Sequence, residues 1–563
     1  MLPLSVTEPA TGPRHATHPD WWRGAVIYQI YPRSFYDTDG NGIGDLAGIT
    51  AKLDHVESLG VDAIWISPFY PSPMDDFGYD VSDFTDVDPI FGTLEDFDRL
   101  IAAAHDRDLK VIIDLVISHT SDRHPWFKQS RASRDNARAD WYVWADPRAD
   151  GTPPNNWLSI FGGSAWAWDT RRRQYYLHNF LTSQPDLNFH NAQVQDAVLD
   201  AARFWLERGV DGFRLDTVNF YFHDKALRDN PPLPPGKPIS GVERSNPYSY
   251  QDHVHDKTRP ENLVFLERLR ALTDSYRHVT MVGEIGSDHD PFATTAAYTQ
   301  AGKRLHMAYG FDLLTTDSSA AYIRRTIRAM ESCIGDGWPS WAVSNHDVPR
   351  VVTRWGGVHP PEAFAPLIVA LVTSLRGTPC LYQGEELGLQ EAEVAFEHIQ
   401  DPYGKEFWPE FRGRDGCRTP MPWDDNAPQT GFSRATAWLP IPDEHRARSV
   451  TRQEADPASS LHRTRRFLSW RRDQPALVSG DIVLLDTPEP ILAFLRVLDG
   501  QEMLCAFNLG PTPARAALDG LSCARLLDAP DFTGEIELAG DVTQLRLEPF
   551  DAVFAQISRS RTR

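Results

Sequence analysis

The chain has 563 residues, of which 41% are hydrophobic and 24% are charged, a length that supports one large core and a smaller second domain. Its formal net charge of −22 at pH 7 argues against nucleic acid and anionic membranes as partners, because both are negatively charged themselves. The five cysteines are scattered and lack metal-site spacing, so we expect no disulfide framework.

The amino-terminal segment lacks the features of a secretory signal. Its first twenty residues, "MLPLSVTEPATGPRHATHPD", contain neither a basic start nor a long apolar segment. No stretch of the chain reaches membrane-spanning length without charges. We therefore expect a soluble, cytoplasmic protein with no membrane partner.

Eight short apolar runs follow one another along the chain, most of them separated by helical patterns. Each run is almost continuously hydrophobic, as expected for strands that are buried on both faces of a parallel sheet. Alternation of strand and helix, repeated in this way, predicts an α/β fold of the (β/α)8 TIM barrel type. The runs cover residues 25–32, 60–68, 110–119, 209–217, 279–285, 306–314, 341–347 and 378–386.

Two segments between these runs carry clear helix signals. Residues 93–110 open with a threonine cap and an acidic first turn. Residues 192–209 have apolar side chains at helical spacing, and Gly209 is a typical stop. The apolar face of this second helix consists of Val194, Val198, Ala201 and Trp205.

Two irregular insertions and a change of pattern divide the chain further. The segment between the third and fourth strands is rich in Trp, Pro and Asn, and predicts a small inserted domain over the active face. A second irregular insertion, residues 387–455, follows the eighth strand. From about residue 480, alternating strands with hairpin turns predict a separate antiparallel β domain. The expected domains are 1–119 for the first part of the barrel, 120–190 for the inserted domain, 191–475 for the second part of the barrel and 476–563 for the carboxyl-terminal domain.

Polar side chains recur at the carboxyl ends of the predicted strands, where barrels of this type carry their active sites. In "DGFRLDTVNF" (211–220), Arg214 and Asp216 share one strand face, because strand side chains alternate. Burying an ion pair there is costly unless it serves a purpose. A purely structural explanation would have to recur strand after strand, so we interpret this rim as a catalytic site. Its residues are Asp114, His119, Arg214, Asp216, Glu284, His346 and Asp347.

The same segments resemble a known family. "DLVISH", "GFRLD", "VGEI" and "SNHD" are similar to the four ordered signature regions of the α-amylase superfamily of glycoside hydrolases. "QPDLN" (184–188) resembles the fifth region in its oligo-1,6-glucosidase and α-glucosidase branch. "GYD", "RGTPCLYQGEE" and "GCRTPMPW" match that branch as well, and the similarity runs from about residue 20 to residue 558.

The resemblance implies a retaining mechanism, in which one carboxylate attacks the sugar and one carboxylic acid protonates the leaving oxygen. It makes Asp216 the nucleophile and Glu284 the acid/base, and it implies that Arg214 keeps Asp216 ionised. We accordingly expect the pKa of Glu284 to be raised relative to that of Asp216.

The resemblance also implies a set of sugar-binding residues. Asp347 matches the third family carboxylate, which binds ring hydroxyls and helps to distort the sugar. Asp76 and Arg418 match the pair that closes the pocket floor in α-glucosidases, and a closed floor implies exo action on one terminal glucose. The other expected substrate-binding residues are Tyr79 (stacking on the ring), His119, Phe180, Arg214, Thr217 and His346.

The segment "DTDGNGIGD" (37–45) has the residue pattern of the start of a calcium loop. An EF-hand would have Glu at its twelfth position, where this chain has Gly48, so the loop is of another kind. It resembles the metal loop after the first barrel strand in the glucosidase branch, and the alternative is a plain polar turn. We expect structural Ca²⁺ or Mg²⁺ and no organic cofactor. The expected ligands are Asp37, Asp39, Asn41, the carbonyl of Ile43 and Asp45, with Gly42 at the sharp turn.

Two positions depart from the pattern of most relatives. Ser118 stands where they carry Asn, which leaves catalysis intact but weakens any second calcium site of the α-amylase type. Thr217 follows the nucleophile where oligo-1,6-glucosidases typically carry Val; in the family, Thr or Ala here accompanies α-1,4 preference.

Together these features predict a retaining exo-α-glucosidase that acts on maltose, short maltooligosaccharides or sucrose, with transfer of glucose to alcohol or sugar acceptors. An oligo-1,6-glucosidase and an isomerase that makes isomaltulose or trehalose are the alternatives, although the isomaltulose-synthase motif "RLDRL" does not occur near residues 320–355. A third hypothesis is a binding module like the transporter heavy chains with this barrel. Those proteins carry a membrane helix and lack the catalytic carboxylates, unlike this chain.

Overall fold

The computed structural model describes residues 18–237, 242, 244–287, 289–539 and 542–559. The segment in which we predicted the absence of a signal sequence therefore lies, up to residue 17, outside the described residues.

Eight parallel strands form one sheet in the order β10-β11-β1-β2-β3-β7-β8-β9. A parallel bridge between Ala308 and Pro339 joins the two end strands, so the sheet curls into a barrel. Each predicted apolar run overlaps one of these strands, which confirms the TIM barrel. The strands are β1 (Ile27–Ile30), β2 (Ala63–Ile66), β3 (Lys110–Leu115), β7 (Gly212–Leu215), β8 (Thr280–Glu284), β9 (Met307–Tyr309), β10 (Ser340–Ala342) and β11 (Thr378–Tyr382).

Helices surround this barrel and bury their apolar faces on it. In α3 (Leu94–His105), the side chains of Thr93 and Asp96 each bond the other's backbone N–H, which forms the predicted cap. In α5 (Ala192–Glu207), all four predicted apolar residues are buried, and the chain leaves the helix through Gly209, whose φ is +96°. The other helices are α1 (Leu46–Ala51), α2 (Leu53–Ser58), α6 (Glu261–Thr273), α7 (Pro291–Thr299), α8 (Ala320–Ile334), α9 (Val351–Arg354), α10 (Pro361–Ser374), α14 (Ser460–Arg472) and α15 (Pro475–Ser479).

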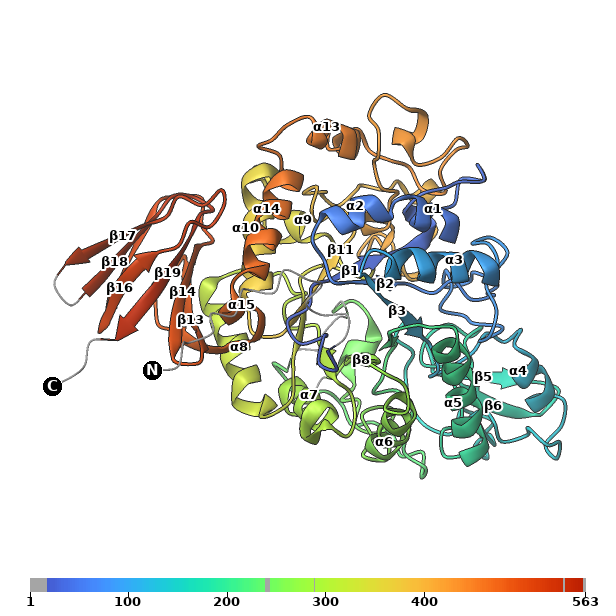
Figure 1. Cartoon of the computed structure of the whole chain (residues 1–563). Coiled ribbons are helices and arrows are strands. Elements are labelled where there is room, and N and C mark those ends of the chain that lie inside the picture. Colours follow the sequence, from blue (N-terminus) through green and yellow to red (C-terminus); the bar gives the residue numbers. More distant parts are fainter. Residues whose placement is uncertain (1–17, 238–241, 243, 288, 540–541, 560–563) are drawn as a thin grey trace, which may run out of the picture.

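Between β3 and α5 the chain forms a small structure of its own, at the right of Figure 1. It consists of α4 (Pro125–Ser130) and a three-stranded antiparallel sheet, β4-β6-β5. Trp157, Trp166 and Leu177 are buried in its core. An antiparallel bridge between His119 and Asp186 joins the end of this inserted structure to the chain just after β3. The strands are β4 (Trp144–Ala145), β5 (Trp166–Asp169) and β6 (Gln174–Leu177).

The second insertion, after β11, contains three short α-helices, α11 (Pro402–Glu406), α12 (Asp443–Arg446) and α13 (Val450–Glu454), besides 3-10 turns. The C-terminal region then forms two antiparallel sheets, at the left of Figure 1, as predicted. Buried Arg496 fastens them to the barrel by donating to the carbonyls of Ser374, Leu375, Leu477 and Gly480. The strands are β12 (Asp481–Leu485), β13 (Ile491–Leu498), β14 (Gln501–Asn508), β15 (Ala514–Asp519), β16 (Leu521–Leu526), β17 (Glu535–Ala539), β18 (Val542–Leu547) and β19 (Ala552–Arg559).

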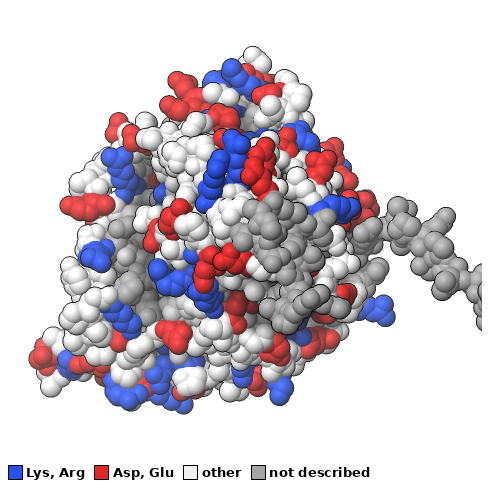
Figure 2. All heavy atoms as spheres, turned by 90° about the vertical axis from the view of Figure 1, so that its left-hand side faces the viewer, with Lys and Arg blue, Asp and Glu red and all other residues white. Residues whose placement is uncertain are grey.

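On the face drawn in Figure 2, acidic and basic side chains are interspersed, without a continuous basic patch. Among the described residues, no helix is both long and apolar enough to cross a bilayer. Cys333, Cys380, Cys417 and Cys505 are free thiols.

Candidate active site

The two carboxylates predicted to do the chemistry bind the same arginine at the carboxyl end of the barrel. Asp216 directly follows β7, and Glu284 is the last residue of the neighbouring β8. Nη1 of Arg214 lies 2.6 Å from Oδ1 of Asp216, and Nη2 lies 2.7 Å from Oε1 of Glu284. All three side chains are buried. One planar guanidinium therefore fixes the spacing between the two carboxylates.

Other strand ends complete the shell around Arg214. Nη1 also lies 2.7 Å from Oδ1 of Asp114 in β3, and Nη2 donates to the hydroxyl of Tyr309 at 2.9 Å. The guanidinium carbon lies 5.0 Å from the ring centroid of Trp65. The predicted buried ion pair is thus the centre of a cluster drawn from five neighbouring strands or their ends.

The protonation of the two carboxyls is coupled. Burial raises the pKa of Asp216 to about 7 and that of Glu284 to about 7, against the opposing effect of the Arg214 charge. Two adjacent carboxyls that titrate near neutrality share about one proton at pH 7. The pair can therefore supply one carboxylate and one carboxylic acid together. That Glu284 is the member that carries the proton stays a prediction.

Neutral histidines line the same end of the barrel. Burial lowers the pKa of His119 to about 4 and that of His346 to about 3, so both rings are neutral at pH 7. His346 Nε2 lies 3.2 Å from Oδ2 of Asp347 and 2.5 Å from the hydroxyl of Tyr79. The rings of Tyr79 and His346 are parallel within 2°, with centroids 5.3 Å apart. These four side chains line one cavity, where a sugar would find hydroxyl partners.

An arginine that sequence reasoning did not single out holds the floor of this cavity. Nη2 of Arg414 lies 3.0 Å from Oδ1 of Asp76 and 2.8 Å from Oδ1 of Asp401, while Nη1 lies 3.1 Å from Oδ1 of Asp347. Burial disfavours the charge of Asp347, but its contacts with His346, Arg414 and Arg418 lower its pKa well below the usual range. Asp347 is therefore a fixed anion.

The predicted pairing of Asp76 with Arg418 needs correction. Arg418 binds Oδ1 of Asp347 at 3.0 Å and the carbonyl of His346 at 2.7 Å, whereas the ion pair of Asp76 is with Arg414. Both arginines flank the short 3-10 turn Asp415–Cys417, and Asp401 draws Arg414 to the side of Asp76. The signal was in the sequence, four residues upstream of Arg418 in "RDGCR".

Thr217 connects the carboxylates of Asp216 and Glu284. Its φ of +40° lies in the left-handed region, which is strained for a β-branched residue and is often found at functional sites. Its backbone N–H donates to Oε2 of Glu284 at 3.1 Å, and its hydroxyl lies 3.3 Å from Oδ2 of Asp216. The same hydroxyl lies 3.1 Å from that of Ser118.

The whole cavity has an empty volume of about 940 Å³ including its mouth. Beyond the charged groups, it is lined mainly by apolar and aromatic side chains, which we call the outer wall. Phe180 is among them as predicted, with its ring 5.3 Å from that of His119. Sequence reasoning missed the others, because an aromatic residue in an irregular segment carries no periodic signal. This outer wall consists of Ile160, Phe161, Phe180, Phe220, Tyr248, Phe311, Val348 and Tyr403.

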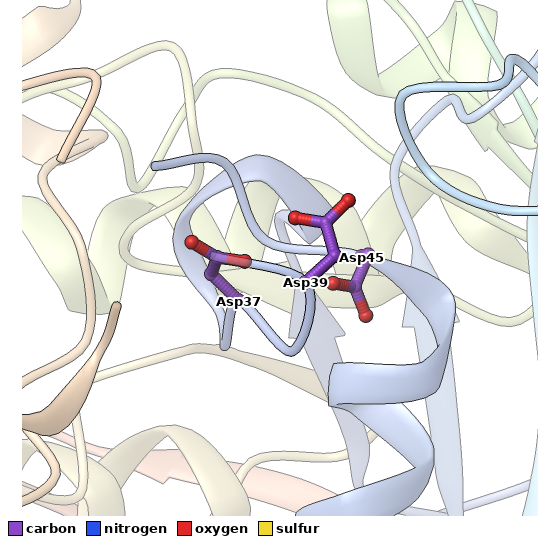
Figure 3. A group of neighbouring side chains, drawn as sticks. All are labelled: Asp37, Asp39 and Asp45. Carbon is purple, nitrogen blue, oxygen red and sulfur yellow. The ribbon is translucent and has the colours of Figure 1, made fainter. Parts of the chain in front are cut away.

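The loop after β1 brings together Asp37, Asp39 and Asp45, whose nearest ligand atoms lie within 4.8 Å of one another (Figure 3). Burial and the neighbouring carboxylates Asp37 and Asp45 raise the pKa of Asp39. A cation would relieve this repulsion, and the all-oxygen donor set suits Ca²⁺ or Mg²⁺. Asn41 Oδ1 accepts from the N–H of Ile43 at 2.8 Å, which shapes the loop around the three carboxylates.

Gly48 explains why this loop is not an EF-hand, and Gly42 shapes its turn. A Cβ at Gly48 would lie 1.9 Å from the carbonyl oxygen of Tyr36, so a twelfth-position glutamate cannot fit there. Gly42 has a φ of +93°, as expected for the sharp turn, and a Cβ there would meet the Thr436 carbonyl at 2.2 Å. Oδ2 of Asp37 accepts from Ser433, which joins the loop to the second insertion.

Comparison with known proteins gives matches over most of the chain. The family model described as "Alpha amylase, catalytic domain" matches residues 29–480. A probable alpha-glucosidase of Rhizobium meliloti (strain 1021) is 57% identical over 96% of this chain and 97% of its own. An oligo-1,6-glucosidase of Parageobacillus thermoglucosidasius is 35% identical over 94% of this chain and 98% of its own.

Solved structures agree with these sequence matches. The alpha-glucosyl transfer enzyme XgtA superposes with a TM-score of 0.93 at 60% identity, covering 96% of this chain and 99% of that one. The trehalulose synthase MutB from Pseudomonas mesoacidophila MX-45 superposes with a TM-score of 0.85 at 34% identity, covering 96% and 99%. With this barrel, this cluster of carboxylates and these relatives, the chain belongs to the alpha-amylase family and is an enzyme of the glycoside hydrolase and transferase type.

Proposed function

We propose that the protein is a retaining, exo-acting α-glucosidase that releases terminal α-1,4-linked glucose from maltose and short substrates, and that also transfers glucose to alcohols or sugars. The observation that carries this proposal is the single guanidinium bound to both Asp216 and Glu284. Retaining enzymes place their carboxyls about 5–5.5 Å apart and inverting enzymes about 6.5–9.5 Å apart. One arginine bound to both at hydrogen-bond distance favours the shorter spacing.

In this mechanism Asp216 attacks the anomeric carbon while Glu284 gives its proton to the leaving oxygen. The glycosidic bond breaks, and a glucosyl ester of Asp216 forms. Glu284, now a carboxylate, then takes a proton from water or an alcohol as that oxygen attacks the same carbon and expels Asp216. Two inversions return the α configuration. Arg214 stabilises whichever carboxylate is ionised in each step.

Exo action is supported by the closed floor. Asp76, Asp347 and Asp401 each bind Arg414 there, and Asp76, Asp401 and Arg414 are buried. A glucan chain would have to break these ion pairs to pass through the floor. The floor therefore favours one terminal glucose at a time.

Transfer to acceptors other than water is supported by the outer wall. Aromatic side chains there would exclude water from the glucosyl-enzyme. They would also bury the apolar part of an alcohol, which stabilises the bound alcohol by roughly 25 cal/mol per Å² of apolar surface removed from water. The similar structure of XgtA is described as that of an alpha-glucosyl transfer enzyme. We propose maltose, short maltooligosaccharides and sucrose as glucosyl donors.

Isomerisation of sucrose and hydrolysis of α-1,6 links are the competing functions. Proteins named trehalulose synthase and oligo-1,6-glucosidase are similar to this chain, but at 34% and 35% identity, against 57% and 60% for the probable alpha-glucosidase and XgtA. Thr217, beside the nucleophile, also favours α-1,4 specificity by the family pattern. We therefore rank hydrolysis and transfer of α-1,4-linked glucose first.

We further propose that the loop at Asp37 binds structural Ca²⁺ or Mg²⁺ through Asp37, Asp39 and Asp45. In that role the ion holds a loop joined to the second insertion and takes no part in bond breaking. The cytoplasmic location stays a prediction.

Product analysis tests the proposal. The enzyme is incubated with maltose, isomaltose or sucrose, each with and without an added alcohol such as butanol. We expect faster glucose release from maltose than from isomaltose, and an alkyl α-glucoside when the alcohol is present. Accumulation of isomaltulose or trehalulose from sucrose, with little free glucose, would instead establish an isomerase.

A further inference from the structure

A buried asparagine lies directly behind the outer wall. Asn246 follows β7 in the chain and is 1% exposed, and it does not itself line the cavity. Its side-chain nitrogen donates to the carbonyl of Ile160 at 2.7 Å and to the hydroxyl of Tyr403 at 3.1 Å. Its side-chain oxygen accepts from the backbone N–H of Tyr248 at 3.0 Å. Each of these three partners is a residue of the outer wall.

The three partners belong to separate parts of the chain. Ile160 lies in the first insertion, 86 positions before Asn246, and Tyr403 lies in α11 of the second insertion, 157 positions after it. Tyr248 lies in the long loop between β7 and α6. One side chain therefore joins both insertions to the loop that follows the nucleophile strand.

The partners determine which way the amide of Asn246 faces. The carbonyl of Ile160 can only accept, so the side-chain nitrogen faces it, and the N–H of Tyr248 can only donate, so the oxygen faces that group. Both N–H bonds of the nitrogen are then used, one on Ile160 and one on Tyr403. An aspartate of the same shape has no N–H to donate, so an amide is what these three partners require.

Hydrogen bonds from Asn246 fix an arrangement that apolar packing alone leaves open, because hydrophobic contact has no preferred direction. The ring of Tyr403 stacks on that of Phe161, with centroids 5.0 Å apart, and the ring of Phe180 lies 5.7 Å from Phe161 on its other contact. Asn246 holds this stack at both ends, through the Tyr403 hydroxyl and through the backbone of Ile160 beside Phe161.

We propose that Asn246 is a positioning residue that holds the three segments of the outer wall together, and that it thereby favours transfer of glucose to alcohol over hydrolysis. The inference rests on the proposed function. In the transfer step the alcohol oxygen bonds the anomeric carbon, the bond from that carbon to Asp216 breaks, and the alcohol proton passes to Glu284. Water reacts by the same route, so the ratio of the two products measures how well the wall seats alcohol and excludes water.

Partition of one glucosyl-enzyme between butanol and water tests the proposal. The donor is α-glucosyl fluoride, because its leaving group is a single atom and does not need the outer wall. Asn246→Ala should lower the ratio of butyl α-glucoside to glucose by about 2- to 12-fold, the range that one hydrogen bond is worth. Its kcat/KM for α-glucosyl fluoride should stay unchanged. Both products come from the same intermediate, so a smaller fraction of folded enzyme does not alter their ratio.

A matched control removes a buried asparagine far from the cavity. In the carboxyl-terminal β domain, the side-chain nitrogen of Asn508 donates to the carbonyls of Thr512 and Glu548, each at 2.8 Å. Its oxygen accepts from the N–H of Gly510 at 3.0 Å, two positions further on, as in the bond from Tyr248 to Asn246. Asn508→Ala should leave the product ratio unchanged, even where it lowers the melting temperature.

Two further variants complete the test. Asn246→Asp keeps the shape of the side chain and the acceptor for Tyr248 but loses both donors, so it should lower the ratio as well, should Asn246→Ala fold poorly. Tyr403→Phe removes the hydroxyl that accepts from Asn246 and keeps the ring. It should lower the ratio by a smaller factor, and combined with Asn246→Ala it should lower it no further than Asn246→Ala alone.

An unchanged product ratio in both Asn246 variants would overturn the proposal, and so would an equal fall in Asn508→Ala. Independent factors that multiply in the double variant would show that Asn246 does not act through Tyr403 and would contradict it too. Failure of the proposed function is visible in wild type alone, as no butyl α-glucoside, and would remove the inference with it.

Discussion

The floor and the outer wall of the same cavity are built in opposite ways. The floor consists of charged and polar groups that bind one another, with Arg414 between Asp76, Asp347 and Asp401. The outer wall is largely apolar, with Phe161 stacked on Tyr403 at 5.0 Å between ring centroids. In the floor, Asp347 lies beyond β10, Asp76 lies in the loop after β2, and Asp401 and Arg414 belong to the second insertion, whereas most of the wall comes from inserted segments and long loops. In the proposed function, the charged floor holds the terminal glucose and the apolar wall selects the acceptor.

The largest effect is expected when the proposed nucleophile, Asp216, is removed from the polar end of the cavity. Asp216→Ala should lower kcat/KM for maltose by several orders of magnitude, because the glucosyl ester can no longer form. Added azide should attack from the vacated face and give a β-glucosyl azide from an activated α-glucoside. Mass spectrometry and NMR of the products check this, and activity that persists without azide would refute the assignment.

The next effect concerns the acid. Glu284→Gln should lower kcat/KM for maltose by about 10²- to 10⁴-fold and spare nitrophenyl α-glucoside, whose leaving group needs no proton. Equal losses on both substrates would contradict the role of Glu284.

The same variant also tests which carboxyl group causes each limb of the pH profile. Both carboxyl pKa values are raised to about 7, so wild-type activity should fall below that pH as Asp216 gains a proton and above it as Glu284 loses one. Glu284→Gln has no proton to lose, so its profile on nitrophenyl α-glucoside should keep the acid limb and lack the alkaline limb. An alkaline limb that persists with the same midpoint would assign it to another group.

A smaller effect is expected at the outer wall. Phe220→Leu should lower the ratio of transfer to alcohol over transfer to water by about two- to fivefold, because less apolar surface remains to bury the acceptor. Phe222→Leu is the matched control, since Phe222 is buried against Phe189 instead. The ratio of alkyl glucoside to glucose measures the shift. Equal changes in both variants would show that the outer wall does not select the acceptor.

The smallest effect is expected at the metal loop, outside both regions. Chelation should lower the melting temperature by a few degrees, and Ca²⁺ or Mg²⁺ should restore it by mass action. Asp39→Ala should abolish this dependence without changing the maltose to isomaltose ratio, and the exposed Asp150→Ala should retain it. If chelator leaves the melting temperature of wild type unchanged, the loop is a plain turn without a structural metal.

The two carboxylates bound to Arg214 were predictable from the sequence, whereas half of the floor and most of the outer wall were not. Strand ends in a parallel barrel must converge, so Arg214, Asp216 and Glu284 could be placed together from apolar periodicity and short motifs. The ion pair of Asp76 was assigned to the wrong arginine, because the sequence does not show which of the two arginines that flank the 3-10 turn reaches Asp76.

The wall depends on how irregular segments fold back, and their contacts are long-range. Phe161 and Tyr403 stack although 242 positions separate them, and neither position carries a local signal. The contact between Ser118 and Thr217 is also long-range. Each residue stood out in the sequence as unlike the residue expected in most relatives, but nothing there indicated that the two are in contact.

The stereochemistry of the first product tests the retaining mechanism most directly. Proton NMR of maltose hydrolysis, recorded before mutarotation, distinguishes the two anomers of the glucose released from the non-reducing end. Asp216 and Glu284 on one guanidinium predict that the α-anomer appears first and that β-glucose follows only by mutarotation. Initial release of β-glucose would show a single inversion and contradict Asp216 as a covalent nucleophile.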